Sequence, residues 1–260
     1  MNSFSRVLDA PPAVRPEAPL PTRRIRWTGE IRAILATLRL PPALGLAAML
    51  LLVDIALIVA HLVRAYTGNP EAPAFDLGLD RGYAEFLQYA KCVWAILLLG
   101  VLFARTRAAV LVVWATVFAY LAVDDAFQVH ERVGGAVRSR VAGEPESAQH
   151  LGELGFFLFV GMLVVGVVLT LHRRTPQYAR SVSTILLGLL AALAFCGVVF
   201  DALGALFLQG TAWSTPLTVL EDGGETLVMT AVIVLLFAVA LCERPTTQAD
   251  AERIVAGPSA

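Results

Sequence analysis

Six apolar segments, each about as long as a bilayer is thick, constrain this chain more than any other feature of its sequence. They cover residues 44–65, 84–104, 108–129, 152–172, 184–207 and 218–242. A helix needs about 20 mostly apolar residues to cross roughly 30 Å of hydrocarbon, and each segment approaches or exceeds that length. Since 57% of the residues are hydrophobic and only 16% are charged, a soluble domain is excluded. The sequence therefore predicts an all-α polytopic membrane protein with a bundle of six transmembrane helices.

The arginines and lysines predict the orientation of this bundle. Fourteen of the 20 lie in the two tails and in the connections after the second and fourth segments, which all face one side. Five lie on the other side, and Lys91 lies within a span. The positive-inside rule then places both termini in the cytosol. The expected domains are a cytosolic tail over 1–43 with an interfacial helix over 28–40, a transmembrane domain over 44–242 and a cytosolic tail over 243–260.

Acidic and imidazole side chains gather at the outer end of the predicted helices. They are Asp124, Asp125, His130, Glu131, His150, Glu153, Asp201, Glu221, Asp222 and Glu225. A carboxylate inside the hydrocarbon costs about 2.5–3.5 kcal/mol unless it is paired, coordinated or hydrated. At 1.5 Å per residue, Asp124, Asp201 and Glu225 lie about 24–26 Å above the inner ends of their helices, and thus at one depth. We expect these three carboxylates to share one pocket, with His130 at its rim.

The residue types in this cluster are typical of a metal site. Hard carboxylate oxygens that converge with an imidazole from facing helices are ligands of iron, manganese and zinc. The expected cofactor is one such divalent ion, and its candidate ligands are Asp124, His130, Glu131, Asp201, Glu221 and Glu225. The i, i+4, i+7 spacing of Asp124, Gln128 and Glu131 predicts that these three share one helix face. His150 follows a Gly-Glu-Pro turn and is interpreted as a surface histidine.

Further charged residues lie inside or beside the predicted spans. Asp54 is near the middle of the first segment and Lys91 is within the second. Because a buried charge needs a partner, we expect them to pair with one another or with the outer carboxylates. The alternative is a proton path from the outer cluster to the cytosol, and His61, two turns above Asp54, would extend either network. The expected supporting residues of the site are Glu85, Asp125, Glu153 and Asp222.

Two short strings carry a resemblance to a known group of proteins. Residues 124–131 read Asp-Asp-Ala-Phe-Gln-Val-His-Glu, and residues 221–225 read Glu-Asp-Gly-Gly-Glu. They resemble uncharacterised multi-pass bacterial membrane proteins in which one helix ends in Asp-Asp/Glu-x4-His-Glu and the last helix opens with Glu-Glu-x-x-Glu. Asp222 replaces the second glutamate and keeps its charge. The resemblance implies a multi-pass protein of the bacterial inner membrane with a site at these residues, and it names no reaction.

Three functions are compatible with these features. The first is a periplasm-facing metal site that acts on a lipid or quinone-like substrate arriving through the bilayer. The second is a cation- or proton-coupled transporter, although the spans lack the paired broken helices of many secondary transporters. The third is a structural or assembly protein whose acids satisfy one another. The lipid bilayer is the expected partner and nucleic acid is not; phosphate loops, GxSxG, HExxH and CxxC motifs are absent.

Overall fold

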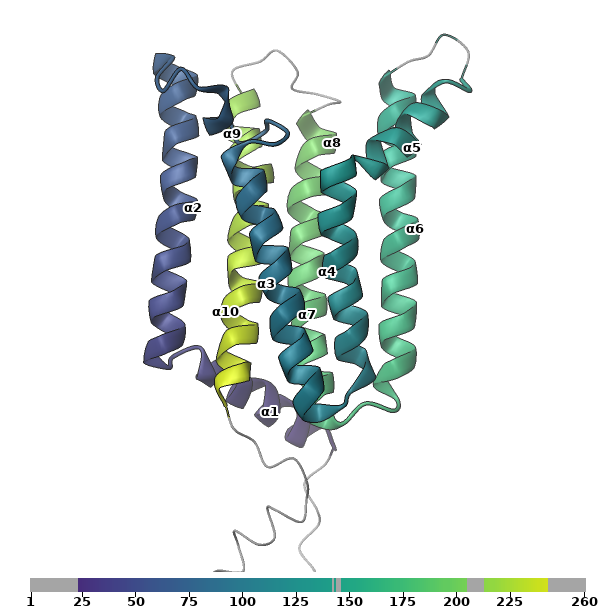
Figure 1. Ribbon diagram of the computed structural model, residues 1–260. Helices are drawn as coiled ribbons and strands as arrows, with labels where there is room; N and C mark the ends of the chain where they lie inside the picture. Colours follow the sequence, from purple (N-terminus) through teal and green to yellow (C-terminus); the bar gives the residue numbers. More distant parts are fainter. Residues whose placement is uncertain (1–22, 142, 144–145, 205–212, 243–260) are drawn as a thin grey trace, which may run out of the picture.

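The computed structural model describes residues 23–141, 143, 146–204 and 213–242, and among these residues there are helices and no strand. Six helical stretches are long and apolar enough to cross a membrane, so the protein is an all-α, six-span membrane bundle, as the sequence predicts. The spans are Pro41–Thr67, Tyr83–Thr106, Ala109–Phe127, Ser147–His172, Gln177–Leu203 and Ser214–Leu241. They stand side by side and roughly parallel in Figure 1.

The bounds of the helical elements, in chain order, are as follows. They are α1 (Arg23–Thr37), α2 (Pro41–Thr67), the 3-10 turn η1 (Pro73–Phe75), α3 (Tyr83–Thr106), α4 (Ala109–Phe127), α5 (Val129–Arg138), α6 (Glu146–His172), α7 (Gln177–Ala194), the π-helical η2 (Phe195–Phe200), α8 (Asp201–Leu203), α9 (Ser214–Thr218), the π-helical η4 (Val219–Gly223) and α10 (Gly224–Leu241). The fifth and sixth spans are thus composite, since each contains a π-helical stretch.

Prolines and glycines decide where the first helices begin and end. α1 begins at Arg23 and ends at Thr37, earlier at both ends than the helix predicted over 28–40. Pro41 and Pro42 occupy the first turn of α2, where a missing N–H donor costs nothing. Gly68 ends α2 with φ 77°, a left-handed conformation that glycine adopts without steric cost.

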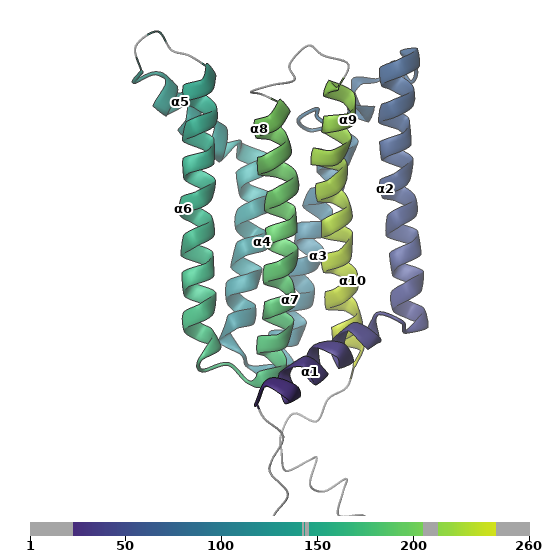
Figure 2. The same cartoon turned by 180° about the vertical axis from the view of Figure 1, so that it is seen from behind.

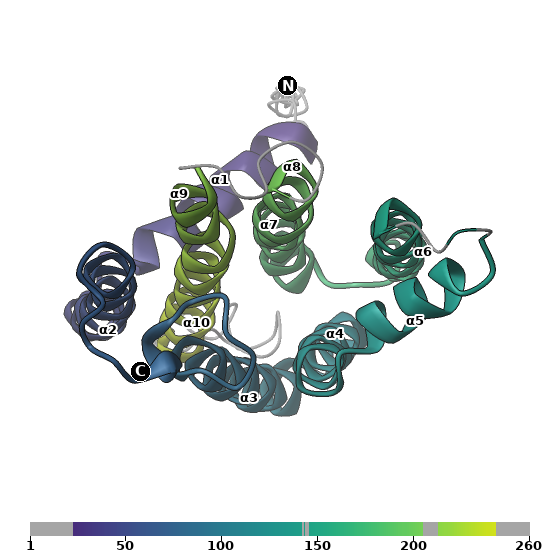
Figure 3. The ribbon, with the colours of Figure 1, turned by 90° about the horizontal axis from the view of Figure 1, so that it is seen from above.

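The third predicted segment ends earlier than its sequence suggests. α4 ends at Phe127, and Gln128 takes a left-handed conformation with φ 50°. The chain then turns and continues as α5, which runs across the end of the bundle from α4 toward α6 (Figure 3). The prediction that Asp124, Gln128 and Glu131 share one helix face is therefore wrong, because Asp124 and Glu131 lie on different helices.

α10 is the central helix of the bundle. It packs against α2, α3 and α7. In the sixth span, Ser214–Leu241, which contains α10, 56% of an apolar 18-residue stretch is buried, against 6% in the span formed by α6. Figure 3 shows α10 between these three helices and α6 at the periphery, beside α4 and α5. α1 crosses beneath α7 and α10 at the opposite end from α5 (Figure 2). We call the end that carries α5 and α8 the acidic end, because Asp124, Glu153 and Asp201 lie there.

The connection between α2 and α3 folds over the acidic end. Leu77 in this connection is buried, and Asp80 accepts a hydrogen bond from Gln128 Nε2 at 2.6 Å. A Cβ atom on Gly78 would lie 3.4 Å from Asp222 Oδ2, so the connection also touches η4. Residues 68–82 thereby join α2, η4 and the turn between α4 and α5.

Candidate metal centre

Three residues from two helices bring metal-ligand atoms together at the acidic end. His150 and Glu153 lie one turn apart on α6, and Asp201 is the first residue of α8. One donor atom from each lies within 4.8 Å of the other two. Glu153 is buried, whereas His150 and Asp201 are half-buried. Among the described residues, this is the group of histidine and acidic side chains whose spacing suits a metal ion.

The polar atoms inside this group are only partly satisfied. Glu153 Oε1 accepts a hydrogen bond from Gln149 Nε2 at 3.0 Å, which orients the carboxylate. Glu153 Oε2 instead faces His150 Nδ1 at 3.4 Å, and this buried imidazole nitrogen makes no hydrogen bond. Buried polar atoms are usually paired, and an ion bound between these two atoms would pair both. The donor set, one imidazole and two carboxylates, is one that iron, manganese and zinc accept.

Two glycines allow α5 to approach α6 closely beside this group. A Cβ on Gly134 of α5 would lie 2.7 Å from Glu153 Cγ and 2.8 Å from the carbonyl oxygen of Gln149. A Cβ on Gly152 of α6 would lie 2.9 Å from Cβ of Val137. Any larger residue at these positions would separate the helices. The glycines therefore let α5 cover Glu153 and shield it from solvent.

Asp124 and His130 form a pair that stabilises the turn between α4 and α5. Asp124 is 1% exposed; its Oδ1 accepts the His130 backbone N–H at 3.1 Å, and its Oδ2 lies 3.1 Å from His130 Nδ1. Burial disfavours the charged imidazole, but the hydrogen bond and charge of Asp124 outweigh burial and raise the pKa of His130. Asp124 and His130 thus bind each other, and the pair stabilises the turn after α4 and the start of α5.

Glu131 and Glu85 also lie at the acidic end outside the three-residue group. Burial and the nearby Asp80 carboxylate raise the pKa of Glu131, which is half-buried on α5. Glu85 accepts hydrogen bonds from the Arg81 backbone N–H and the Tyr89 hydroxyl in the first turn of α3. Glu85 therefore helps to begin α3.

A second carboxylate-rich region lies where η2 and η4 pack against each other. Glu221 and Asp222 belong to η4, and Glu225 follows in the first turn of α10. A Cβ on Gly197 of η2 would collide with Glu225 Oε1, and one on Gly224 would lie 2.8 Å from Cys196 Sγ. The glycines thus let Glu225 lie directly against the backbone of the neighbouring span. The apolar pattern of these two spans does not predict their paired π-helical stretches.

The predicted ion pair between the first two spans is confirmed. Lys91 Nζ lies 2.7 Å from Asp54 Oδ1 and donates to both the carbonyl and the hydroxyl oxygen of Thr226 at 2.8 Å. The Thr230 hydroxyl donates to Asp54 Oδ2 at 2.6 Å. Both charges are completely buried and fully hydrogen-bonded, and they join α2, α3 and α10. His61 does not extend this network, because its Nδ1 accepts the backbone N–H of Leu77 at 3.2 Å.

The predicted ligands are therefore divided among several places. Of the six candidates, Asp201 belongs to the three-residue group; Asp124, His130, Glu131, Glu221 and Glu225 do not. Glu153, predicted as a supporting residue, is a member. His150, interpreted from the sequence as a surface histidine, is half-buried and is also a member of the group, because α6 begins before it and the turn of helix places it beside Glu153. The i, i+3 spacing of His150 and Glu153 was the signal that could have identified them.

The spans and the acidic end define an integral, multi-pass membrane protein with a carboxylate and histidine cluster at one end of its bundle. The family model of a domain of unknown function, DUF8692, matches residues 31–241. The chain therefore belongs to the DUF8692 family. No curated protein and no solved structure matches the chain.

Proposed function

We propose that this protein is a metalloprotein of the bacterial inner membrane, in which His150, Glu153 and Asp201 bind a divalent iron, manganese or zinc ion at the periplasmic face. The observation that carries this proposal is the buried His150 Nδ1, which has no hydrogen bond and faces the buried Glu153 carboxylate at 3.4 Å. Asp201 supplies a third donor from another span. An ion would thus join α6 to α8, which share no other charged pair in the described residues.

If His150, Glu153 and Asp201 held an ion, three protein ligands would leave coordination positions open for water or substrate. Such an ion would activate water or polarise a substrate oxygen. Gln149 holds the Glu153 carboxylate in place, and α5 shields it from solvent. These residues provide the fixed geometry that such a reaction requires.

The position of α6 favours a substrate that arrives through the bilayer. α6 contributes two of the three ligands and is the least buried of the spans. Its exposed side chains include Leu158, Phe159 and Met162, so lipid reaches this helix along its length. We therefore propose a lipid or quinone-like substrate that approaches between the bilayer and the acidic end.

A second candidate function, a cation- or proton-coupled carrier, is favoured by a different observation. Glu225 is adjacent in sequence to Thr226, whose carbonyl and hydroxyl oxygens accept hydrogen bonds from Lys91. Along the chain, Glu225 and the acids of η4 thus directly precede the residue that binds Lys91. Intramembrane ionisable residues in such a series are typical of proton relays.

Metal analysis of the full chain, purified in detergent, tests the first function. We expect about one ion per chain in the parent and at least a tenfold loss of metal affinity in Glu153→Gln and in Asp201→Asn, since each removes a charged ligand. Glu131→Gln is the matched control, because Glu131 is a half-buried acid at the same end outside the group. A parent without stoichiometric metal would refute the proposal. Metal that Glu225→Gln removes and Glu153→Gln leaves in place would refute this ligand set.

Ion flux in proteoliposomes tests the second function. A carrier that uses the Lys91–Asp54 pair should lose flux in Glu225→Gln while its metal content remains that of the parent. Flux that is absent in the parent would contradict transport. Unchanged flux in Glu225→Gln would contradict a role for this carboxylate.

A further inference from the structure

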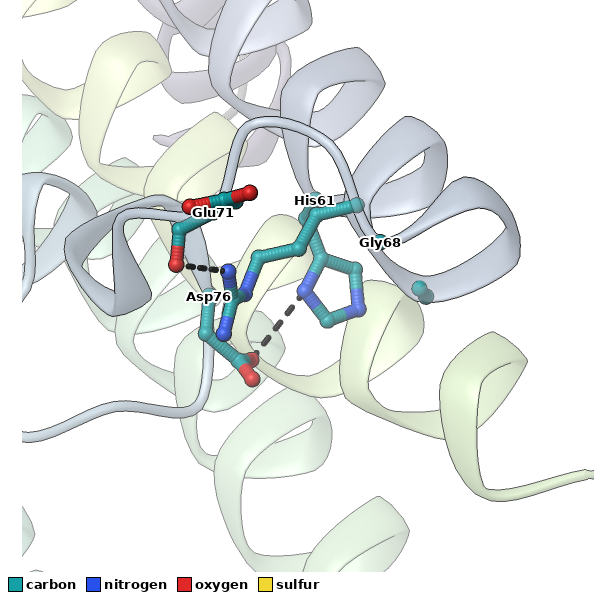
Figure 4. A pocket seen from close by; sticks show the side chains of 6 residues that line it. His61, Gly68, Glu71 and Asp76 are labelled. Carbon is teal, nitrogen blue, oxygen red and sulfur yellow. Dashed lines mark hydrogen bonds and ion pairs between the residues drawn. The ribbon is translucent and has the colours of Figure 1, made fainter.

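A cavity of about 400 Å³ lies at the acidic end of α2, beside the connection that follows it (Figure 4). It is lined by His61, Arg64, Ala65, Gly68, Glu71 and Asp76. None of these residues belongs to the metal centre, and α2 packs against α10 and α3. The cavity is therefore separate from the metal centre.

His61 presents a hydrogen-bond donor that has no acceptor. The residue is 5% exposed, and its Nε2 atom is buried without a hydrogen-bond partner. Its Nδ1 atom accepts the Leu77 N–H at 3.2 Å and lies 3.1 Å from Asp76 Oδ1. Because Nδ1 accepts the Leu77 N–H, the hydrogen of the neutral ring is on Nε2. Buried donors of this kind normally have a partner, so one is expected from the ligand.

Arg64 adds a positive charge to the same cavity. Its Nη1 donates to the carbonyl oxygens of Pro70 and Glu71 at 2.8 and 2.6 Å, which holds the guanidinium at the cavity wall. No carboxylate of the described residues lies within ion-pair distance of it. A guanidinium and an imidazole N–H together favour an anionic oxygen, and phosphate oxygens suit the planar guanidinium best.

The place of the cavity in the bilayer indicates which phosphate it binds. Arg64 lies in the last turn of α2, where a spanning helix leaves the hydrocarbon and meets the lipid headgroups. The exposed apolar side chains of Leu52, Ile55, Val59 and Val63 lie along the same helix and would contact acyl chains. The carboxylates of Glu71 and Asp76 line the cavity and would attract a cationic group.

We propose that this cavity binds the phosphate of an amine-bearing phospholipid headgroup, with Arg64 and His61 as donors to the phosphate and Glu71 and Asp76 facing the amine. The same chemistry is present in a free phosphate ester. The site serves to bind a headgroup beside α2, and it does not depend on metal at His150.

The test is the dissociation constant of dihexanoyl phosphatidylethanolamine for the full chain in detergent, measured by calorimetry. We expect Arg64→Gln and His61→Phe each to weaken binding at least tenfold. His61→Gln, which keeps an N–H donor, should recover part of the affinity. Arg132→Gln is the matched control, because Arg132 is an exposed arginine on α5 outside the cavity, and we expect a change of less than twofold.

O-phosphoethanolamine and inorganic phosphate distinguish the two sources of the phosphate. If the lipid binds at least tenfold more tightly than either soluble compound, the ligand is a phospholipid headgroup. If the soluble compounds bind as tightly as the lipid, the phosphate-binding role of the cavity is supported and its ligand is a free phosphate ester. Absence of binding to the parent, or equal losses in Arg132→Gln and Arg64→Gln, would overturn the proposal. Melting curves and metal content of each variant show whether it is folded, and His61→Phe decides the matter if Arg64→Gln does not fold.

Discussion

Replacing Gly134 by alanine should force α5 away from α6 and disturb the metal centre. The new Cβ would lie 2.7 Å from Glu153 Cγ, 2.9 Å from Glu153 Oε1 and 2.8 Å from the Gln149 carbonyl oxygen. Carbon atoms in good contact are about 3.5–4.0 Å apart, so the first contact is too short by roughly 1 Å. A rotamer change of Glu153 cannot relieve the contact with Gln149, because that oxygen belongs to the backbone. The two helices must therefore separate.

The magnitude follows from two opposing terms. Overpacking of this kind costs about 1–3 kcal/mol. Replacing a glycine inside a helix by alanine returns about 0.5–1 kcal/mol of conformational entropy. Gly135→Ala provides the matched control, because it lies on the same helix and its Cβ would meet no atom within 4 Å. The difference between the two variants is then the overpacking term alone, about 1–3 kcal/mol in the free energy of unfolding.

Thermal unfolding of both variants in one detergent measures this difference. At about 2–4 °C per kcal/mol for chains of this size, Gly134→Ala should melt roughly 2–12 °C below Gly135→Ala. Metal affinity should fall in Gly134→Ala and stay at the parent value in Gly135→Ala, since the collision involves Glu153 itself. Equal melting temperatures in the two variants would refute the close packing of α5 on α6.

Two further predictions concern charged pairs. Lys91→Met leaves the Asp54 carboxylate buried without its cation, so we expect the free energy of unfolding to fall by about 3–5 kcal/mol. Adding Asp54→Asn should restore part of this loss, and a Lys91→Met variant as stable as the parent would contradict the prediction. For His130, the folded-state pKa is raised, so its pairing with Asp124 contributes fully below about pH 6.5 and is lost as the pH rises through the folded-state pKa. The melting temperature of the parent should therefore decline as the pH rises above about 6.5 more steeply than that of His130→Gln, and parallel profiles would count against the pair.

The sequence predicts those features of this protein that depend on distances and charges counted along the chain. The six spans follow from the number of consecutive apolar residues, because that number must match the thickness of the hydrocarbon. The pairing of Asp54 with Lys91 follows from the cost of a lone buried charge, since no other basic residue lies as deep in a span. The gathering of acids at one end follows from the rise per residue of a helix.

The partner of each polar side chain depends on neighbours that the sequence does not specify. The residue type of Gln128 does not predict that the helix ends there. The Asp124 carboxylate stabilises the turn by accepting the His130 N–H. His61 lies on the side of Asp54 by helical spacing, yet the connection over 68–82 folds back and presents the Leu77 N–H instead.

The other end of the bundle shows the same dependence. His172 is the last residue of α6, and its Nε2 lies 2.9 Å from Ser183 Oγ, which also accepts a hydrogen bond from Trp114 Nε1 at 2.7 Å. Three helices, α4, α6 and α7, meet in this contact.

The number of spans and the end of the bundle at which the acids lie follow from the amino-acid sequence, because both depend on distances counted along a helix. The grouping of His150, Glu153 and Asp201 as candidate ligands depends instead on the packed fold, because donor atoms converge only when the neighbouring helix and its rotation are fixed. That rotation is set by close packing, above all by the glycines between α5 and α6 and between η2 and η4, where one Cβ atom would separate the helices.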